Sequence, residues 1–554
     1  MSSSEAVPSR LRFWIFLLLT TAALLRLTYA LEMGQGFEFQ RHEWRQTDMH
    51  FFVKRGRQIS YGDWWSRSIS LPRHSWLTRI QTRKQWKQWL GKRFYQSPGY
   101  SYVVAVSLSL WGSVWPVKIF QMMLGVLSLF LLYSVGRSLF SWRVGLLAAI
   151  GGLLYGPFLY LEPMLLRTTL LTFVGLALLA LVVRLRNQPS ILAAGLLGLL
   201  LGLAVLFKAT WLLLLGFLPL LLRKSEQVTQ SKGKVWVVLG LGFCMAISPL
   251  VVRNIVVGAS PASMSANGPL VFVQGNAPDA KPQPNFRSRY FKDIFLKAQG
   301  RLLPTVTQTL GSHSIWSFLK LHFVRMWAVF RMEEAPNNTC FALAQKQSSI
   351  LGFLRLNFLL LTPFALMGWF LMASGSTRER WALWVLLAFL LLHATSWLWG
   401  GHMMRYRITA VPLFLLGAAY LLERLIVWVQ QRELKSVAIT VGAAIVLALL
   451  INVPSHGRVV PIRVADYLSP MLHAVKTTRF EEGCKVATFA AQAKPQTFKR
   501  LETLMCGCWK SQKACLNQQC QANLWKSCRS GFFRELGNLS KRRAKQKRRK
   551  SKLK

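Results

Sequence analysis

The chain has 554 residues, of which 52% are hydrophobic, and its mean hydropathy is +0.31. Such a composition excludes an ordinary soluble enzyme of this length. The chain carries 69 Lys and Arg against 20 Asp and Glu, a formal net charge of +49. Because the basic residues concentrate in short links between apolar runs, we interpret most of this charge as orientation signals rather than as a nucleic-acid interface.

The apolar runs recur along the chain and are Leu-rich and continuous. Runs of about 20 apolar residues cross roughly 30 Å of hydrocarbon as α-helices. Transmembrane β-strands alternate instead, so a barrel is not expected. We predict an all-α polytopic membrane protein with about 11 transmembrane helices. Its first apolar run, Phe13 to Ala30, carries Arg26 and lacks a clean A-x-A site, which favours an uncleaved signal anchor over a signal peptide.

The predicted spans follow one another with two long interruptions. The first interruption is a polar, Trp-rich loop that ends near Pro98, within which residues 76–94 could lie flat at the membrane interface. The run from Tyr100 to Gly112 is short, at about 13 residues, and we expect a re-entrant or interfacial helix there. A loop of about 100 residues follows the seventh span. The expected spans are 12–31, 116–136, 143–161, 164–183, 190–206, 209–222 and 235–252, two that flank 376–380, and two that flank 430–435.

The links between spans set the expected orientation. With a cytoplasmic N-terminus and a non-crossing segment at 100–112, the basic links all fall on the cytoplasmic side, as such links do. They comprise residues 136–143, 184–187, 223–234, 376–380 and 430–435. The charged groups without an orientation role then gather on the opposite face. They comprise Asp48, Glu162, Lys208, Arg253, Arg405 and Arg407.

A compositional boundary lies near Pro454, where the apolar spans end. We expect residues 1–454 to form the membrane domain and residues 455–554 to form a basic, Cys-rich tail without a core. Six of the 8 cysteines lie in this tail, and none of them shows the CxxC spacing of a zinc site. The run from Lys541 favours anionic lipid or nucleic acid.

Two carboxylates, Asp48 and Glu162, stand at the ends of separate predicted spans. Such a pair can act as a general base and an orienting group, or can hold a divalent cation. The alternatives are structural. Asp48 could pair with Arg45 or Arg55, and Glu162 could be a helix-capping neighbour or a partner of Arg167.

Basic residues at the membrane edge supply the other half of a candidate site. Arg405 and Arg407 flank Tyr406, and Lys208 lies between two predicted spans. Arginine grips phosphate oxygens in pairs, and lysine acts as a point charge. Each of these residues could instead snorkel at the interface. Together, facing carboxylates, they favour a phosphate site beside a base.

Four stretches in the same order give a family resemblance, over roughly residues 12–455. The stretches "WRQTDMHFF…GRQISYGDWW…FYQSPGYSY", "LYLEPMLLRTTL", "SPLVVRN…QGNAPDA" and "RYRITAVP" resemble GT-C glycosyltransferases, including protein O-mannosyltransferase and aminoarabinose transferase relatives. The resemblance implies that Asp48 is the catalytic carboxylate and that Glu162 belongs to the second acidic loop. Some relatives have Glu-Lys where this chain has Gln96 and Ser97. The expected substrate-binding residues are Arg45, Gln96, Lys208, Arg253, Asn276, Arg405, Tyr406 and Arg407.

The expected function is inverting transfer of a sugar from a polyprenyl-phosphate donor to a lipid, glycan or protein acceptor. The expected location is the plasma (inner) membrane, with the active site on the extracytoplasmic face. No cofactor is certain, although Asp48 and Glu162 could hold a divalent metal ion. The alternative is a transporter or flippase of lipid-linked sugars, and nucleic-acid binding is not expected.

Overall fold

The computed structural model describes residues 10–453 apart from 45–46, 69, 72–79, 223–231 and 285–287, together with residues 462, 466–467 and 470. Nearly all of the predicted tail, 455–554, and its six cysteines therefore lie outside the described residues. Within the described part, every regular element is a helix and none is a strand, which confirms the predicted all-α class.

In the described part of the chain, seven stretches are long and apolar enough to cross a membrane. They are α1 (Leu11–Met33), α6 (Trp115–Leu139), α9 (Thr168–Asn187), α13 (Lys232–Val256), α21 (Thr377–Gly400), α24 (Leu434–Asn452), and the continuous run of α22 (Met404–Arg407), η4 (Ile408–Ala410) and α23 (Val411–Gln430). Five shorter apolar stretches accompany them. They are α5 (Gly99–Trp111), α7 (Trp142–Leu154), α10 (Ile191–Phe207), η3 (Ala209–Leu213) with α11 (Leu214–Leu222), and α20 (Phe358–Ser374).

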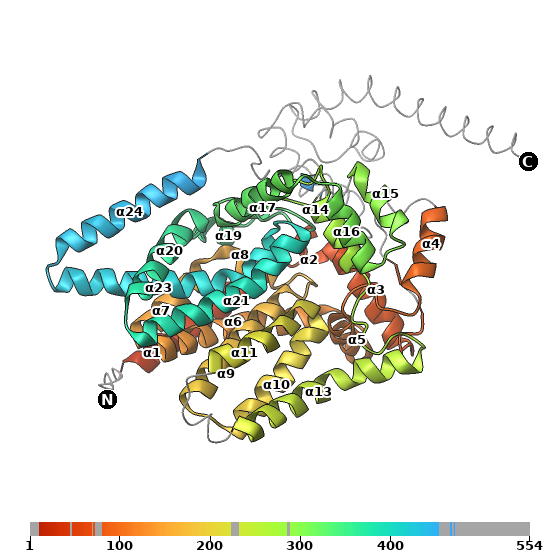
Figure 1. The fold of residues 1–554 in the computed structure, drawn as a ribbon. Coiled ribbons are helices and arrows are strands. Elements are labelled where there is room, and N and C mark those ends of the chain that lie inside the picture. Colours follow the sequence, from red (N-terminus) through yellow and green to blue (C-terminus); the bar gives the residue numbers. More distant parts are fainter. Residues whose placement is uncertain are drawn as a thin grey trace, which may run out of the picture.

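The remaining helices belong to the two long loops and to short turns. They are α2 (Phe37–Gln40), η1 (Arg41–Glu43), α3 (Asp48–Ser60), α4 (Ile80–Leu90), α8 (Gly156–Leu161), α14 (Gly268–Asn276), α15 (Arg289–Lys297), α16 (Leu302–Gly311), α17 (Ile315–Phe330), α18 (Phe341–Gln347) and α19 (Ser349–Phe353). In Figure 1, α3, α4, α15 and α16 gather at one end of the bundle. Helix α4 packs on α15, because the Trp86 and Phe295 rings lie 4.9 Å apart.

Helix α5 has 13 residues, which agrees with the expectation of a short segment, and whether it crosses the membrane stays a prediction. Its first residue, Gly99, packs against the end of α10. Just beyond its other end, the Trp115 ring lies 5.9 Å from Phe39, which follows α1.

Contacts bring together three of the predicted basic links, 136–143, 184–187 and 376–380, whereas most of the link 223–234 lies outside the described residues. Arg378 donates a 2.9 Å hydrogen bond to the Ser138 carbonyl, which joins the α20–α21 link to the α6–α7 link. The Arg186 guanidinium stands 4.3 Å from the centre of the Trp381 ring. Links that are far apart in sequence are thus neighbours, as the charge pattern predicted.

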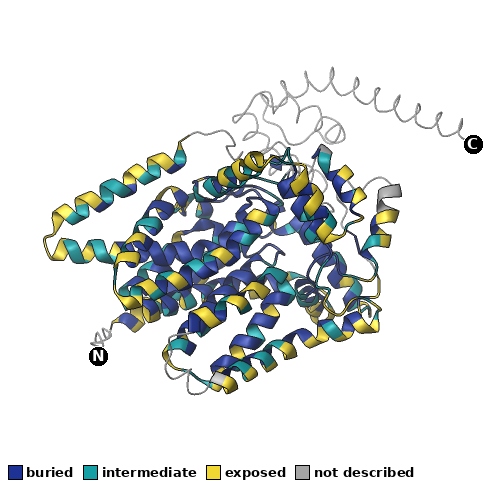
Figure 2. Cartoon of the chain, in the orientation of Figure 1, coloured by how far each residue is buried: buried dark blue, intermediate teal, exposed yellow. Residues whose placement is uncertain are grey.

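Burial follows membrane packing. Helix α9 lies mostly inside the bundle, whereas α24 is largely exposed (Figure 2). Small residues permit close approach of helices in lipid. At Gly198 on α10, an added Cβ would lie 1.9 Å from the Leu239 carbonyl oxygen of α13. Only glycine fits at this contact.

Candidate active site

Asp48 is the first residue of α3 and is buried, with 9% of its surface exposed. Thr47 caps the helix by accepting a 3.2 Å hydrogen bond from the backbone N–H of His50. Gln96 Nε2 donates to Asp48 Oδ1 at 3.1 Å, and Asn338 Nδ2 donates to Asp48 Oδ2 at 2.8 Å. Arg405 forms an ion pair with the same Oδ2. These donors stabilise the ionised carboxylate and fix its position.

Arg405 is one of three cations around Asp48. The Lys208 ammonium stands 5.0 Å from the centre of the Tyr406 ring, and the Arg405 guanidinium stands 5.3 Å from it. Lys208 also donates to the Ser396 hydroxyl. Arg167 donates to the Phe207 carbonyl at 2.9 Å, directly before Lys208. The charges of Arg405 and Asp48 both act on Arg167, which places it in the same cluster.

Lys208 has an altered acidity. Burial of its ammonium, together with the neighbouring charges of Arg167 and Arg405, lowers its pKa to about 7. A phosphate group placed among these cations would favour the charged form of Lys208. The cluster therefore has the electrostatics of an anion site.

Asn338 is held in place by a buried ion pair between Glu38 and Arg41. Arg41 Nη1 donates a 2.7 Å hydrogen bond to the Asn338 carbonyl, and Tyr160 donates to Glu38 at 2.8 Å. This network connects the loop after α1 to the loop before α18. It orients the Asn338 amide toward Asp48.

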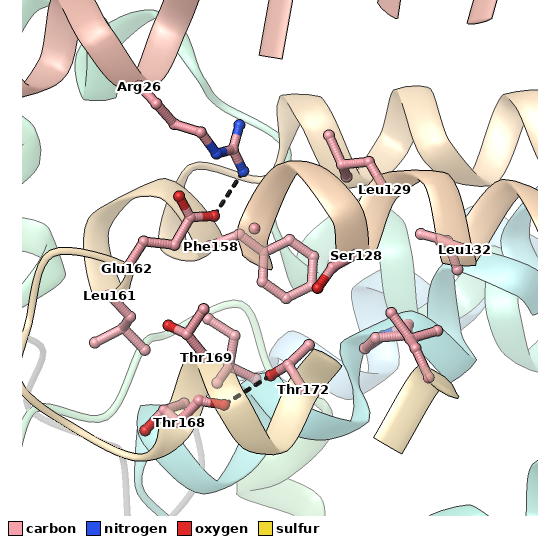
Figure 3. Close-up of a pocket in the computed structure, with 14 residues that line it drawn as sticks. Arg26, Ser128, Leu129, Leu132, Phe158, Leu161, Glu162, Thr168, Thr169 and Thr172 are labelled. Atoms are coloured by element: carbon pink, nitrogen blue, oxygen red, sulfur yellow. Dashed lines mark hydrogen bonds and ion pairs between the residues drawn. The ribbon is translucent and has the colours of Figure 1, made fainter. Parts of the chain in front are cut away.

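Glu162 has a different environment from Asp48. Its carboxylate forms a 2.6 Å ion pair with Arg26 of α1, and both side chains line a buried pocket between α1, α6, α8 and α9 (Figure 3). Gly125 makes room for it, because an added Cβ would lie 2.0 Å from Glu162 Oε1. Among the described residues, Glu162 Oε2 and Arg26 Nε have no hydrogen-bond partner. The contact that the structure gives Glu162 is thus to Arg26, and its predicted role toward an acceptor or metal stays a prediction.

Breaking this pair is expected to destabilise the protein. Glu162→Gln leaves Arg26 buried without a counter-charge, which costs about 3–5 kcal/mol in buried pairs. Thermal unfolding in detergent should show a clearly lower Tm. The double variant Arg26→Met/Glu162→Met, which removes both charges, should recover most of the loss. A single variant as stable as wild type would contradict this account of the pair.

Three other predicted residues are engaged in structural contacts. Arg253 donates to the backbone carbonyls of Trp65, Ser66 and Lys92. Asn276 donates to three carbonyls and accepts from Arg325. Arg407 is fully buried and pairs with Glu334 at 2.7 Å. The structure does not bring Asn276 and Arg407 to Asp48 through any of these contacts, and Arg45 lies outside the described residues.

Two members of the cluster were not predicted as site residues from the sequence. Arg167 was considered only as a partner of Glu162, and its stretch "LLRTTL" gave no other signal. Asn338 lies in "APNNTC", where nothing points to Asp48, some 290 residues earlier. Among the described residues, no group of three His, Cys, Asp or Glu side chains could hold a metal ion.

Residues 95–252 match the family described as dolichyl-phosphate-mannose-protein mannosyltransferase. Over that part of the chain, the match agrees with the predicted resemblance to protein O-mannosyltransferases. No curated protein matches the sequence significantly.

Solved structures with a similar course of the chain are distant in sequence. The oligosaccharyltransferase AglB of Archaeoglobus fulgidus, in complex with an inhibitory peptide and a dolichol-phosphate, is 14% identical with a TM-score of 0.40, over 80% of this chain and 55% of its own. The apo oligosaccharyltransferase of the same organism is 16% identical with a TM-score of 0.43, over 79% and 54%. ArnT of Cupriavidus metallidurans in the apo state is 14% identical with a TM-score of 0.39, over 89% and 74%. The chain thus spans just over half the length of the oligosaccharyltransferase.

Proposed function

We propose that the protein is a membrane glycosyltransferase that moves a sugar from a polyprenyl-phosphate donor to a lipid, glycan or protein acceptor. The observation that carries this proposal is the contact between Asp48 and Arg405, with Lys208 and Arg167 beside them. The family match over residues 95–252 supports the same reaction class. An acid flanked by phosphate-binding cations is what this transfer requires.

The cations are proposed to hold the donor phosphate. The donor is a phosphodiester, and cleavage of its sugar–oxygen bond leaves a phosphate monoester with an additional negative charge. Arg405 contacts the Asp48 carboxylate, and Arg167 and Lys208 lie beside Arg405, so the three cations outnumber this one carboxylate. Preorganised cations stabilise charge that develops in the transition state. The cluster therefore favours departure of polyprenyl phosphate.

Asp48 is proposed to act as the general base. It removes the proton of the acceptor nucleophile as that atom attacks the anomeric carbon, so the sugar configuration inverts. Gln96 and Asn338 hold the carboxylate in position. Arg405 neutralises Asp48, and a bound phosphate would compete for Arg405. Donor binding would thus raise the basicity of Asp48.

We further propose that the site faces away from the cytoplasm in the plasma (inner) membrane and that the N-terminus is cytoplasmic. Support comes from the basic links that gather at the opposite end of the bundle. Lys92→Cys, near the site, should react with a membrane-impermeant maleimide in intact cells, measured against the native cysteine background. Arg378→Cys should react only after permeabilisation. Labelling of both from the same side would overturn this orientation.

A transfer assay tests the proposed function. The purified protein in vesicles is given radiolabelled polyprenyl-phosphate mannose or another polyprenyl-phosphate sugar, with membrane extract as acceptor. Transfer releases polyprenyl phosphate and labels an acceptor. A transporter, the rival class, would move intact donor across the bilayer without cleaving it. Donor translocation without cleavage for every sugar tested would refute the enzyme proposal.

Donor affinity is expected to depend on pH through Lys208. Its pKa is lowered to about 7, so the ammonium form, which attracts phosphate, prevails below pH 7 and is lost as the pH rises. The donor Kd should therefore rise above pH 7, by up to tenfold per unit. Lys208→Arg, which stays charged, should remove this dependence. A flat wild-type profile from pH 6 to 9 would contradict it.

A further inference from the structure

A second basic pocket lies beside the candidate active site. Four cationic side chains line it, together with several serine hydroxyls, and the described lining residues include no carboxylate. The cations are Arg55, Lys92, Arg93 and Arg253. The acid that contacts them is Asp63, which lies 3.4 Å from Arg55. The pocket therefore carries a marked excess of positive charge.

The walls of the pocket are held in a fixed form. Arg253 donates to the Ser66 carbonyl, and Arg55 donates to the Ser68 carbonyl at 2.8 Å and to its hydroxyl at 3.0 Å. By contrast, Lys92 is exposed and Arg93 is half-exposed. Among the described residues, the Lys92 ammonium and Arg93 Nη1 have no hydrogen-bond partner. These two groups are available to a ligand.

The pocket reaches Asp48 through one shared residue. Gln96 lines the pocket and also donates its amide hydrogen to Asp48 Oδ1 at 3.1 Å. Phe51, one turn after Asp48 on α3, lines it as well. A molecule anchored here would therefore lie next to Gln96, the residue that contacts Asp48 Oδ1, whereas Arg405 contacts Oδ2.

The pocket also lies at the ends of two apolar helices, the last turn of α13 and the first turn of α5. Arg253 stands in the last turn of α13, and Pro98 caps α5. On one side of Arg253 along α13, the side chains of Val252 and Val256 are 47% and 48% exposed. A headgroup in the pocket would therefore have exposed apolar surface next to it for its chains. This arrangement favours a lipid over a soluble ligand.

We propose that this pocket binds the phosphate group of a lipid-borne acceptor and thereby sets the class of acceptor that Asp48 activates. The inference rests on the proposed function for its acceptor role. The binding itself does not depend on transfer. Phosphate is matched by guanidinium and ammonium donors together with hydroxyl groups.

Binding of radiolabelled phosphatidic acid to the purified full chain in detergent tests the proposal. The double variant Lys92→Gln/Arg93→Gln should raise its Kd at least tenfold, since charge-assisted hydrogen bonds are lost. The matched control, Lys84→Gln/Lys87→Gln, changes exposed residues of α4 outside the pocket and should leave Kd within twofold. An equal loss in both double variants would mean general surface charge and would overturn the site.

Three further arms identify the ligand. Inorganic phosphate should compete only weakly if the lipid chains contribute, whereas full competition at equal concentration would assign the pocket to free phosphate and overturn the lipid claim. Displacement by poly-glutamate would indicate an acidic protein acceptor instead. Polyprenyl phosphate should bind Lys92→Gln/Arg93→Gln with the wild-type Kd. Loss of polyprenyl-phosphate binding in this variant would assign the pocket to the donor. Asp48→Asn should retain phosphatidic acid, so failure of transfer and failure of this site are separable.

Discussion

Replacing Asp48 by Asn is expected to lower kcat for sugar transfer by about 10²–10⁴-fold, the usual contribution of a general base. Asparagine has nearly the same shape but cannot accept the proton. Binding of the donor should be retained or become tighter, because Arg405 loses the carboxylate that it contacts and can turn fully to the donor phosphate. The variant should therefore be inserted, folded and able to bind donor, but nearly inactive.

The matched control for this variant is Asp293→Asn. Asp293 lies on α15 and is exposed, so the same chemical change there should leave kcat within twofold. Initial rates of transfer, together with equilibrium binding of polyprenyl-phosphate mannose, check both variants. Equal losses in both variants would point to a general effect on the protein instead of to a base at residue 48.

Replacing Arg405 by Gln is expected to affect donor binding and chemistry together. A hydrogen bond to a charged group contributes about 1.5–3 kcal/mol, so the donor Kd should rise by about 10- to 100-fold. The rate of sugar transfer from bound donor should fall too, because Arg405 no longer stabilises the negative charge that develops on the leaving phosphate. Arg405→Lys keeps the charge but not the paired donors. Its donor Kd and its transfer rate should therefore lie between those of the wild type and those of Arg405→Gln.

Arg355→Gln serves as the control for Arg405→Gln, because Arg355 is exposed at the α19–α20 turn. Donor titrations by equilibrium binding and single-turnover rates separate the two effects. A variant that binds donor as wild type does and turns it over at the wild-type rate would remove Arg405 from the phosphate site.

The membrane architecture could be predicted from the sequence for a simple physical reason. Helix length and apolar composition must match the bilayer, and both are local properties. The sequence also predicted that Asp48 and Arg405 lie on the same side of the membrane, because the charge of the links indicates which span ends share a face. The described residues agree with this pattern where two basic links meet and where Arg405 contacts Asp48.

The pairing of individual charges could not be predicted in the same way. Glu162 contacts Arg26, which lies 136 residues earlier, and the local sequence offers Arg167 as a nearer partner. Arg407 looks equivalent to Arg405 in "RYR". Because it lies two residues further along the helix, its side chain points in another direction, into the core toward Glu334. Arg167 and Asn338 join Asp48 only because loops from distant parts of the chain meet. Such contacts depend on tertiary packing that no spacing rule encodes.

One measurement tests the central claim most directly: purified wild type and Asp48→Asn are loaded with radiolabelled polyprenyl-phosphate mannose, and release of the sugar is followed after acceptor is added. The wild type should discharge the bound donor in a rapid single turnover. Asp48→Asn should hold the same amount of donor and discharge it at least a hundredfold more slowly. Discharge from the variant at the wild-type rate would contradict the assignment of Asp48 as the base.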